Sequence, residues 1–590
     1  MTSVSGTARP RCGPRIPPVW RQPAPTKRDS ARLPLEPNSS DTALVSVSLY
    51  RVHNQPPPLV DYNLFEADAP LRESLEREGG AWAQKLVHDV GRLAGTQEAI
   101  DWGFQANANP PQLRTHDRFG NRIDEVEFHP AWHRLMEVAI GHGLHTLPWR
   151  EPRLGAHASR AAAFYVWSQV EGGHGCPVSM TYAAVPALRN QPDLAEKWEP
   201  LMTTLHYDPG LRLASTKRGA LFGMAITERQ GGSDVRTNTT RAVPTGSDGE
   251  HLLTGQKWFC SAPMCDAFLV LAQAPGGLSC FLLPRVLPDG TRNRFQIQRL
   301  KDKLGNRSNA SAEIELVDAW AQLVGEEGRG VRTIIDMVNH TRLDCVIGSA
   351  SLMRQAVAQA THHTAHRSAF GKHLSEQPLM VNVLADLAVE SEATTILMMR
   401  LAGSLDRTSD PAESHFRRLA LAVAKYWTCK RAIAVVAEAL ECHGGNGYVE
   451  ESILPRLYRE APLNSIWEGS GNVNALDVLR AMSREPESVA AFWSEVGHAG
   501  GSDTRLDQAV ADLKRDLANT TEAESGARRL VERLALVLQG SLLLRHGDPD
   551  VAEAFCSSRL GGDWGHSFGT LPSRIKFNSV IDRHRPATNK

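Results

Sequence analysis

Two glycine-rich turns, Glu441-Cys442-His443-Gly444-Gly445-Asn446-Gly447-Tyr448 and Asn464-Ser465-Ile466-Trp467-Glu468-Gly469-Ser470-Gly471-Asn472, lie either side of a short helical pattern at 452–459. Such turns let backbone N–H groups approach a phosphate or a flat ring, because no Cβ is in the way. A carboxylate beside an aromatic and small residues is partly desolvated and suits acid–base work, which makes Glu468 a candidate. Taken alone, the first turn is better explained as an ordinary loop between helices.

Length and composition exclude several classes of protein. The chain has 590 residues, a net charge of −1, 42% hydrophobic and 22% charged residues, which predicts a globular protein of two to four domains. No apolar run is long enough to span a bilayer, and the overall charge gives no nucleic-acid footprint. The 9 cysteines form no C-x-x-C pair, so neither a zinc ribbon nor a disulfide framework is indicated. A reducing cytoplasm fits best.

The hydrophobic period changes twice along the chain. Residues 64–220 are mostly helical in pattern, and alternation at 252–259, 267–272, 278–284, 295–300 and 313–317 predicts strands. Glu313-Ile314-Glu315-Leu316 alternates cleanly, which predicts a sheet with one wet face. Helical patterns return at 331–366, 378–405 and 412–442 and predict an antiparallel bundle. This order lacks βαβ alternation, so it excludes a doubly wound sheet.

Two further segments suit contacts to a ligand. Met224–Val235 passes from a strand into a Gly-Gly loop, where Thr227 and Ser233 can donate to carbonyl or phosphate oxygens. Gly255–Ser261 is a strand with adjacent aromatics. Alone, each has a plainer explanation, a β-turn in the first case and a sheet core with a surface Lys257 in the second. His362 and His366 are four apart on a helix, but no carboxylate joins them, so no metal site is predicted.

Together these segments resemble the acyl-CoA dehydrogenase family. The ordered motifs are Thr-Glu-x-x-x-Gly-Ser-Asp, Gly-Gln-Lys, Arg-x-x-Phe-Gly-Lys, Gly-Gly-x-Gly and aromatic-Glu-Gly-Ser, at 227–234, 255–257, 367–372, 444–447 and 467–470. Within the family, the stretches 107–113, 128–133, 299–311, 455–460 and 464–472 are more similar to the AidB type, flavoproteins of the alkylation response. The resemblance is strong from about 50 to 485, weaker beyond that, and absent before about 48.

The resemblance implies a mainly α fold with a central β-barrel. With it the chain divides into an N-terminal helical domain at 48–220, the barrel at 221–325, a C-terminal four-helix bundle at 326–485 and a helical extension at 486–590. Composition alone predicts a disordered extension at 1–47. The N-terminal extension, rich in Arg, Ser and Pro, can also be a transit peptide, although its prolines break an amphipathic helix.

The resemblance also implies non-covalently bound FAD and a homotetramer. Glu468 matches the family's base, which takes the α-proton of an acyl thioester while the β-hydride passes to the flavin. Its backbone N–H is the family's donor to the thioester carbonyl. The cofactor-binding positions implied are Thr227, Gly232, Ser233, Phe259, Ser261, Arg367, Phe370, Gln377, Gly444, Gly445, Gly447, Trp467, Ser470 and Asn472. Of these, Arg367, Phe370 and the 444–447 turn would hold phosphates across a subunit interface.

The sequence departs from the family pattern in three places. The glutamine after Phe-Gly-Lys is displaced to Gln377. The aromatic-Asp pair that precedes Thr-Arg in the family, where thioester ligands lie, is Val338-Asn339, which puts efficient binding of a CoA ester in doubt. Some members place the base just before that arginine; here the position is Thr341, so Glu468 is the only candidate.

The C-terminal extension is the double-stranded-DNA-binding region that the resemblance implies. Residues 491–590 contain 13 Lys+Arg and 13 Asp+Glu, so the segment is neutral. Candidate phosphate contacts are Lys514, Arg515, Arg528, Arg529 and Arg533. A solvated face paired with neighbouring glutamates explains the last three equally well. No base-recognition motif is present, so any binding would be non-sequence-specific and sensitive to salt.

Three hypotheses follow. The first is an FAD flavoprotein of AidB type that binds duplex DNA in the alkylation-damage response and has weak acyl-CoA dehydrogenase activity. The alternative is a short- or branched-chain acyl-CoA dehydrogenase with Glu468 as base and no DNA role. The third is a flavin-free scaffold, which an absorbance spectrum tests.

Overall fold

The computed structural model describes residues 52–518 and 523–586, so the segment predicted to be disordered at 1–47 lies outside the described residues. The chain divides into two units, 1–53 and 54–590, and the features below belong to the second. Among the described residues, no helix combines the length and apolarity needed to cross a bilayer.

The N-terminal block is helical, as predicted, but contains one hairpin that the periodicity did not reveal. Its strands are β1 (Gln112–His116) and β2 (Arg122–Glu127), which pair antiparallel around a turn at Gly120 (φ 87°). The prediction of a mostly helical pattern at 64–220 did not include this hairpin, because a short two-stranded ribbon lacks the length that periodicity needs. The helices are α1 (Ala69–Arg77), α2 (Gln84–Ala94), α3 (Gln97–Ala108), α4 (Pro130–Gly141), α5 (Leu147–Arg150), α6 (Ala156–Ser168), α7 (Gly175–Leu188) and α8 (Pro192–Met202).

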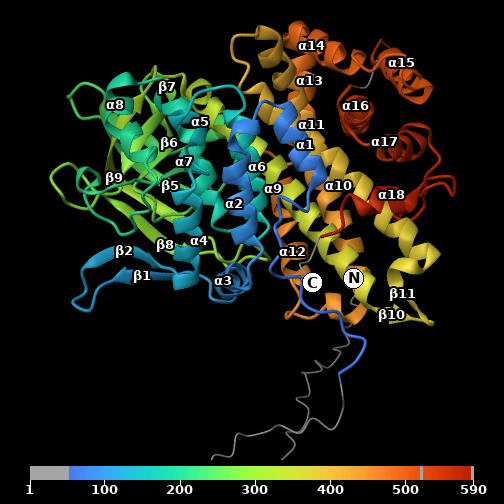
Figure 1. Ribbon diagram of the computed structural model, residues 1–590. Coiled ribbons are helices and arrows are strands. Elements are labelled where there is room, and N and C mark those ends of the chain that lie inside the picture. The colour runs from blue at the N-terminus through green and yellow to red at the C-terminus, as the bar shows by residue number, and fades with distance from the viewer. Residues whose placement is uncertain (1–51, 519–522, 587–590) are drawn as a thin grey trace, which may run out of the picture. The chain divides into compact units, whose positions relative to one another are not determined.

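A β-barrel follows, left of the bundle in Figure 1. Strands β6, β4, β5, β9 and β7 pair in a closed ring, β3 adds to β6, and β8 adds to β9. The bounds are β3 (Phe222–Ala225), β4 (Arg241–Pro244), β5 (Glu250–Ser261), β6 (Ala267–Ala274), β7 (Gly277–Pro284), β8 (Phe295–Leu300) and β9 (Ser311–Val324).

The predicted wet face is wrong at Glu313. This residue is 8% exposed, because Arg299 Nε (2.8 Å) and Lys301 Nζ (2.7 Å) donate to its carboxylate from β8 and the residue after it. Glu313 is therefore covered by two cations, one of them the 62% exposed Arg299, where alternation alone suggested direct contact with water.

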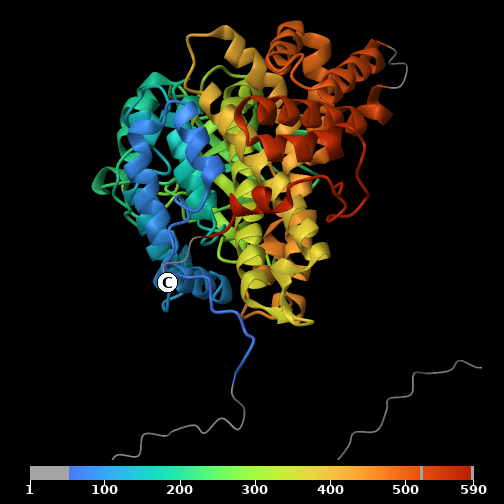
Figure 2. The ribbon, with the colours of Figure 1, turned by 45° about the vertical axis from the view of Figure 1, so that its right-hand side comes forward.

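Three long helices form the bundle and run side by side in both views (Figures 1 and 2). They are α9 (Gly330–His366), α10 (Pro378–Ser404) and α11 (Pro411–Glu441), close to the predicted ranges. Asp410 caps α11 by accepting from Ala412 N at 2.9 Å, and proline opens α10 and α11 at a position where no N–H is needed. α9 begins against the barrel, where a Cβ on Gly330 would lie 2.5 Å from the carbonyl carbon of Ser279.

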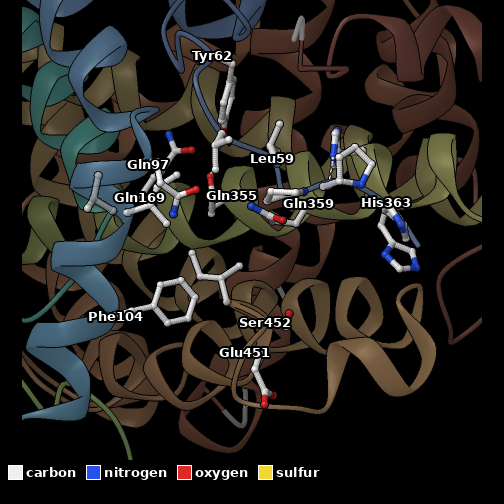
Figure 3. Close-up of a pocket in the computed structure, with 18 of the residues that line it drawn as sticks. Leu59, Tyr62, Gln97, Phe104, Gln169, Gln355, Gln359, His363, Glu451 and Ser452 are labelled. Atoms are coloured by element: carbon white, nitrogen blue, oxygen red, sulfur yellow. Dashed lines mark hydrogen bonds between the residues drawn. The ribbon is translucent and has the colours of Figure 1, made fainter. Parts of the chain in front are cut away.

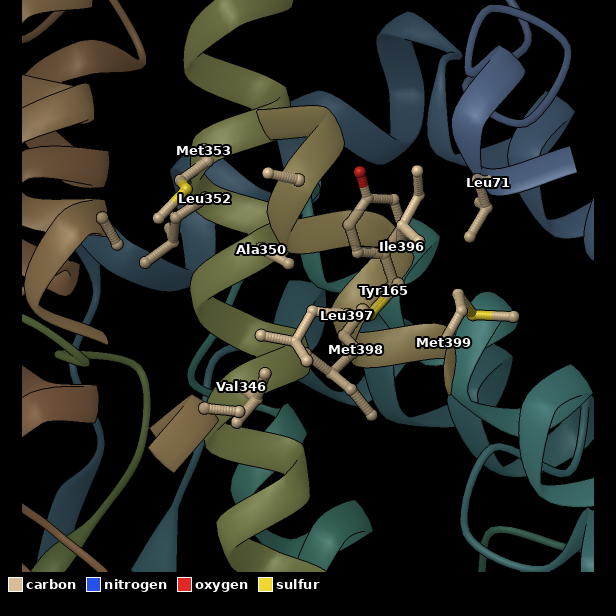
Figure 4. Close-up of a cluster of buried hydrophobic side chains, with 14 of the residues drawn as sticks. Leu71, Tyr165, Val346, Ala350, Leu352, Met353, Ile396, Leu397, Met398 and Met399 are labelled. Carbon is tan, nitrogen blue, oxygen red and sulfur yellow. The ribbon is translucent and has the colours of Figure 1, made fainter. Parts of the chain in front are cut away.

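One apolar core joins the N-terminal helices to the bundle. Figure 4 shows side chains of α9 and α10, such as Met353 and Leu397, meeting Tyr165 of α6 and Leu71 of α1. The C-terminal extension shares this core, because Val531, Leu538 and other residues of α16 are fully or almost fully buried in the same cluster.

The extension comprises α14 to α18. The last helix lies after Gly561, in a segment whose glycine, tryptophan and proline residues predict irregular structure. The bounds of the extension, with those of the helices before it, are α12 (Leu454–Glu460), α13 (Gly471–Arg484), α14 (Pro486–Gly497), α15 (Thr504–Ala518), α16 (Ala523–His546), α17 (Pro549–Phe555) and α18 (Phe577–Asp582). Arg559 anchors it to α10: the guanidinium, with no exposed side-chain surface, pairs with Asp386 and with Glu390 at 2.9 Å.

A second buried polar network joins the N-terminal block, the barrel and the bundle. Glu171, after α6, accepts from Ser308 Oγ at 2.7 Å, and Glu460, at the end of α12, accepts from Asn306 N at 2.6 Å. Burial and the neighbouring charge of Glu171 raise the pKa of Glu460 to about 7. Burial opposes ionisation of Glu171 too, but hydrogen bonds, from His174 above all, outweigh it and lower its pKa to about 2.

We expect Arg559→Met to destabilise the protein by about 3–5 kcal/mol, because it leaves buried Asp386 without its cation and leaves Glu390 with Arg431 alone. Denaturant unfolding followed by fluorescence measures this. The matched control is Arg574→Met, whose side chain is 56% exposed and pairs with Asp563, and which should cost no more than about 1 kcal/mol. Equal losses from the two variants would contradict a structural role for the buried pair.

We expect Glu460→Gln to stabilise the protein increasingly as pH rises from 5 to 8. Because the folded-state pKa is about 7, above the usual 4.5, the native state between these two pH values still holds a proton that the unfolded state has released, so wild-type stability falls as pH rises and levels off above about pH 7. The difference should approach ~3 kcal/mol at pH 8. Melting temperatures of wild type and variant at each pH measure it, with exposed Glu127→Gln as control. A pH-independent difference would contradict the raised pKa.

Candidate functional site

The second glycine-rich turn presents Glu468 between α12 and α13. Glu468 has a left-handed backbone (φ 56°), rare for a residue with a Cβ, and Gly469 follows at φ 97°. No described residue accepts a hydrogen bond from the backbone N–H of Glu468. The backbone of this loop is therefore not helical at Glu468, and it leaves the N–H of Glu468 without an acceptor in the described chain.

The carboxylate of Glu468 lies beside the first third of α9. Arg342 Nε donates to the Glu468 carbonyl at 3.1 Å, and Arg342 NH1 pairs with Asp477 of α13 at 2.8 Å. Burial raises the pKa of Glu468, and Thr341, Arg342 and Lys425 partly oppose that rise. Burial makes such a carboxylate a stronger proton acceptor, and its cationic neighbours limit that increase.

The residues flanking Glu468 are held from two helices. Trp467 Nε1 donates to Asn464 Oδ1 at 3.0 Å, and Asn464 in turn donates to Ser349 of α9 at 3.1 Å. From α11, Lys425 Nζ donates to the carbonyls of Trp467 (2.8 Å) and Gly469 (2.6 Å). Lys425 was not singled out from the sequence, because a lysine within a helical pattern is normally solvated.

The barrel supplies the facing wall. Phe259 is 51% exposed near the end of β5, and Lys301 Nζ lies 4.5 Å from its ring centroid. Trp467 packs against the barrel core from the other side. The thiol of Cys176 is close enough to Ser261 and Glu468 for both to act on it, and burial raises its pKa to about 11. The structure therefore brings Phe259, Ser261, Trp467 and Glu468 to one place.

Part of the Thr-Glu and Gly-Gln-Lys motifs is structural. Lys257, whose plain interpretation from sequence was a surface lysine, is completely buried and pairs with buried Glu228 at 2.9 Å. Glu228 also accepts from Thr240 Oγ1 at 2.6 Å. A Cβ on Gly232 would lie 2.4 Å from Thr227 Oγ1, so this glycine is required by internal packing. Ser233 is exposed in the same loop.

A second group of predicted residues gathers beyond the C-terminal end of α9. Ser368–Ala369 and Lys372–His373 (β10 and β11) form a hairpin whose two-residue turn, Phe370-Gly371, has φ of 53° and 78°. Phe370 is 99% exposed. Gln377 lies behind the hairpin and donates to the Ala369 carbonyl at 3.0 Å.

The glycines of the first turn fall into two kinds. A Cβ on Gly447 would lie 2.3 Å from the Leu440 carbonyl oxygen, so packing requires that glycine. A Cβ on Gly444 or Gly445 would meet nothing within 4 Å, so packing does not explain them. Their surface stays open for a group from outside the chain. In the second turn, Ser470 is partly buried and Asn472, at the start of α13, is exposed.

An N-terminal strap, residues 54–58, ties the hairpin to the first turn and was not found from sequence. Asn54 exchanges two hydrogen bonds with the backbone of Ser368, at 2.8 and 2.7 Å, and its carbonyl accepts from Arg367. Asn446 Nδ2 donates to Gln55 Oε1 at 2.9 Å. Asn54 has a positive φ of 54°, a conformation that asparagine tolerates.

The strap also lines a cavity of about 820 Å³ between α3, α9 and the first turn. Figure 3 shows glutamines 97, 169, 355 and 359 along one side, with Phe104 and Ser452 opposite. No lysine or arginine of the described chain lines it, so it does not suit a phosphate. Among the described residues no group of three metal-ligating side chains converges.

The predicted DNA contacts lie on α15 and α16, and four of the five have partners within the chain. Arg515 pairs with Asp512 and Arg533 with Asp516, Arg528 Nε donates to the Tyr426 hydroxyl at 3.1 Å, and Lys514 Nζ lies 5.0 Å from the Trp493 ring centroid. Arg528 and Arg529 are exposed. These four cations are thus already engaged, at least in part, by neighbouring side chains.

Three family models match the chain in the order of its domains. The Adaptive response protein AidB N-terminal domain matches 54–209, the acyl-CoA dehydrogenase middle domain 223–319, and the acyl-CoA dehydrogenase C-terminal domain 328–483. The Escherichia coli (strain K12) protein AidB is 45% identical over 513 residues, 87% of this chain and 94% of the relative.

An animal relative is similar to this chain in sequence, and a crystal structure from the same organism is similar in fold. Acyl-CoA dehydrogenase family member 11 of Caenorhabditis elegans is 31% identical over 506 residues, 78% of this chain and 81% of the relative. The crystal structure of Caenorhabditis elegans ACDH-11 in complex with C11-CoA superposes with a TM-score of 0.79 at 27% identity, covering 92% of this chain and 98% of that one. The chain therefore belongs to the acyl-CoA dehydrogenase family of FAD-dependent oxidoreductases acting on CH–CH bonds, and within it to the AidB type.

Proposed function

We propose that this protein oxidises the Cα–Cβ bond of an acyl thioester, with Glu468 as the base. The observation that carries the proposal is the position of Glu468: a carboxylate with a raised pKa lies beside the end of β5, where Phe259 exposes its ring. The Glu468 carboxylate would take the proton from Cα while a hydride leaves Cβ, so that a Cα=Cβ double bond would form. FAD supplies the hydride acceptor.

The residues present fit FAD. Phe259, exposed beside Lys301, offers a flat surface for the flavin ring, with Thr227, Ser233 and Ser261 as polar neighbours. Arg367 and the open surface over Gly444 and Gly445 suit a pyrophosphate, because residues 54 and 55 tie this cation to a turn whose glycines have no packing neighbours. The exposed ring of Phe370 then serves as a stacking surface.

The two groups of residues serve one FAD only if subunits associate. Thr341, beside Glu468, and Arg367 are 26 positions apart on and just after α9. At the rise of an α-helix this separation is roughly 39 Å, more than an extended FAD reaches. We infer a homo-oligomer, by family resemblance a tetramer, in which the hairpin and first turn of one subunit complete the site of another. The exposed Phe370 (99%) and Tyr448 (82%) suit such an interface.

We expect Glu468→Gln to slow anaerobic flavin reduction by acyl-CoA thioesters by about 10²–10⁴-fold, because no carboxylate remains to take the α-proton. Stopped-flow absorbance of the flavin measures the rate, with C11-CoA and short branched thioesters as substrates. In wild type the rate should rise with pH through a pKa above the usual glutamate value, since the base acts deprotonated.

The control for this test is Glu137→Gln, an exposed carboxylate on α4 paired with Arg134. It should leave the reduction rate unchanged. If no thioester reduces the wild-type flavin, or if Glu468→Gln reacts as fast as wild type, the catalytic role is wrong. An absorbance spectrum without flavin bands would support the scaffold hypothesis instead.

We also propose a second role, binding of duplex DNA without sequence specificity in an alkylation response. It rests on the similarity to AidB and on the exposed arginines of α16. The alternative, a dehydrogenase with no DNA role, differs only in this property. Deleting 490–590 is a poor test, because α16 shares the core of the bundle.

We expect Arg528→Gln/Arg529→Gln/Arg533→Gln to weaken duplex binding and to flatten its salt dependence. The log–log slope should fall by up to about 0.9 for each phosphate that the variant no longer neutralises. Fluorescence anisotropy over a series of salt concentrations measures both. The control, Arg114→Gln in the β1–β2 hairpin, should bind as wild type does. An unchanged slope in the triple variant would exclude this surface.

A further inference from the structure

Lys425 of α11 is a buried cation without a carboxylate in hydrogen-bonding contact. The residue is 1% exposed, and none of the ion pairs among the described residues includes it. Its two acceptors are the carbonyls of Trp467 and Gly469, at 2.8 and 2.6 Å. A buried ammonium is costly unless its environment compensates it. The Trp467 carbonyl belongs to the peptide that precedes Glu468, and the Gly469 carbonyl lies just beyond the peptide that follows it. The charge of Lys425 is thus placed beside the backbone of the candidate base.

The geometry of the peptide bond links Lys425 to a backbone donor. In a trans peptide the C=O and N–H vectors point in opposite directions, and no cis peptide occurs in the described chain. Because the Trp467 carbonyl is drawn toward Lys425, the N–H of Glu468 points away from α11. That N–H has no acceptor among the described residues. It is therefore a preoriented donor that the described chain leaves without a partner.

We propose that Lys425 is a positioning residue: by fixing the Trp467 carbonyl it aims the N–H of Glu468 at the carbonyl oxygen of the thioester. This inference rests on the proposed dehydrogenation. As the α-proton moves to the Glu468 carboxylate, the electron pair of the C–H bond delocalises onto that oxygen, and a preoriented donor stabilises the growing charge. The cation also polarises the peptide through its carbonyl, which strengthens the N–H as a donor.

The other supports of the loop do not have this effect. Asn474 Nδ2 donates to the carbonyls of Gly469 (2.7 Å) and Ser470 (3.0 Å), and Arg342 Nε donates to the carbonyl of Glu468 itself (3.1 Å). Neither of them touches the Trp467 carbonyl. Asn474 is fully buried, so its truncation perturbs the same loop and provides a matched comparison.

The experiment measures the carbonyl stretch of a bound thioester by isotope-edited infrared spectroscopy. The probe is a ¹³C=O-labelled 3-thia-acyl-CoA, whose β-position is sulfur and cannot lose hydride. Wild type should shift the stretch to lower frequency, Lys425→Met should lose most of that shift, and Asn474→Ala should retain it. With C11-CoA, flavin reduction by Lys425→Met should fall by about 10- to 100-fold, less than the 10²–10³ typical when such a donor is removed.

Lys425→Arg keeps a cation that can reach the same carbonyls and should restore part of the shift, which guards against failure of the methionine variant to fold. Flavin content and melting temperature establish folding for each variant. A full shift in Lys425→Met, or equal losses in Lys425→Met and Asn474→Ala, would overturn the positioning role while leaving the proposed function intact. If wild type binds no thioester, both the proposed function and this inference are wrong.

Discussion

A single helix sets the spacing on which the rest of the site depends. α9 runs 37 residues from the barrel to the β10–β11 hairpin and packs against α6, α7, α10 and α11 along the way. Thr341 and Arg342 near one end meet the Glu468 loop, and Arg367 follows the other end. Because a packed helix cannot shorten, the two halves of the site are held apart. Under the proposed function, the two halves can therefore serve one FAD only between subunits.

Several buried charged groups pair with an opposite charge, whereas Lys425 is bound by backbone carbonyls. Lys257–Glu228 and Arg559–Asp386 are buried ion pairs in which each charge has its opposite, so they hold the barrel and the C-terminal extension in place. Lys425 differs, because its hydrogen-bond partners are backbone carbonyls beside the candidate base. A charge kept in an apolar interior with only dipoles for partners fits a catalytic setting better than a purely structural one.

Most of the fold was predictable from the sequence, because long helices and alternating strands produce strong periods. The bounds of α9, α10 and α11 were predicted to within one or two residues. Short elements without a full period, the β1–β2 hairpin and α18, were missed. So were the pairings of Glu313 and Lys257, because a charged side chain in a strand suggests exposure unless its partner is known. Asn54 and Lys425 could not be found, since their partners lie in remote segments and are backbone atoms.

The strap at 54–58 has a consequence for the order in which the protein matures. Asn54 bonds to Ser368 across 314 positions and Gln55 to Asn446 across 391. At a synthesis rate of about 5–20 residues per second, Gln55 waits about 20–80 s for its partner to be made. The hairpin and the first glycine-rich turn therefore acquire their final shape only when most of the chain exists. Under the proposed function, the surface for the pyrophosphate is then complete only after Asn446 has been made.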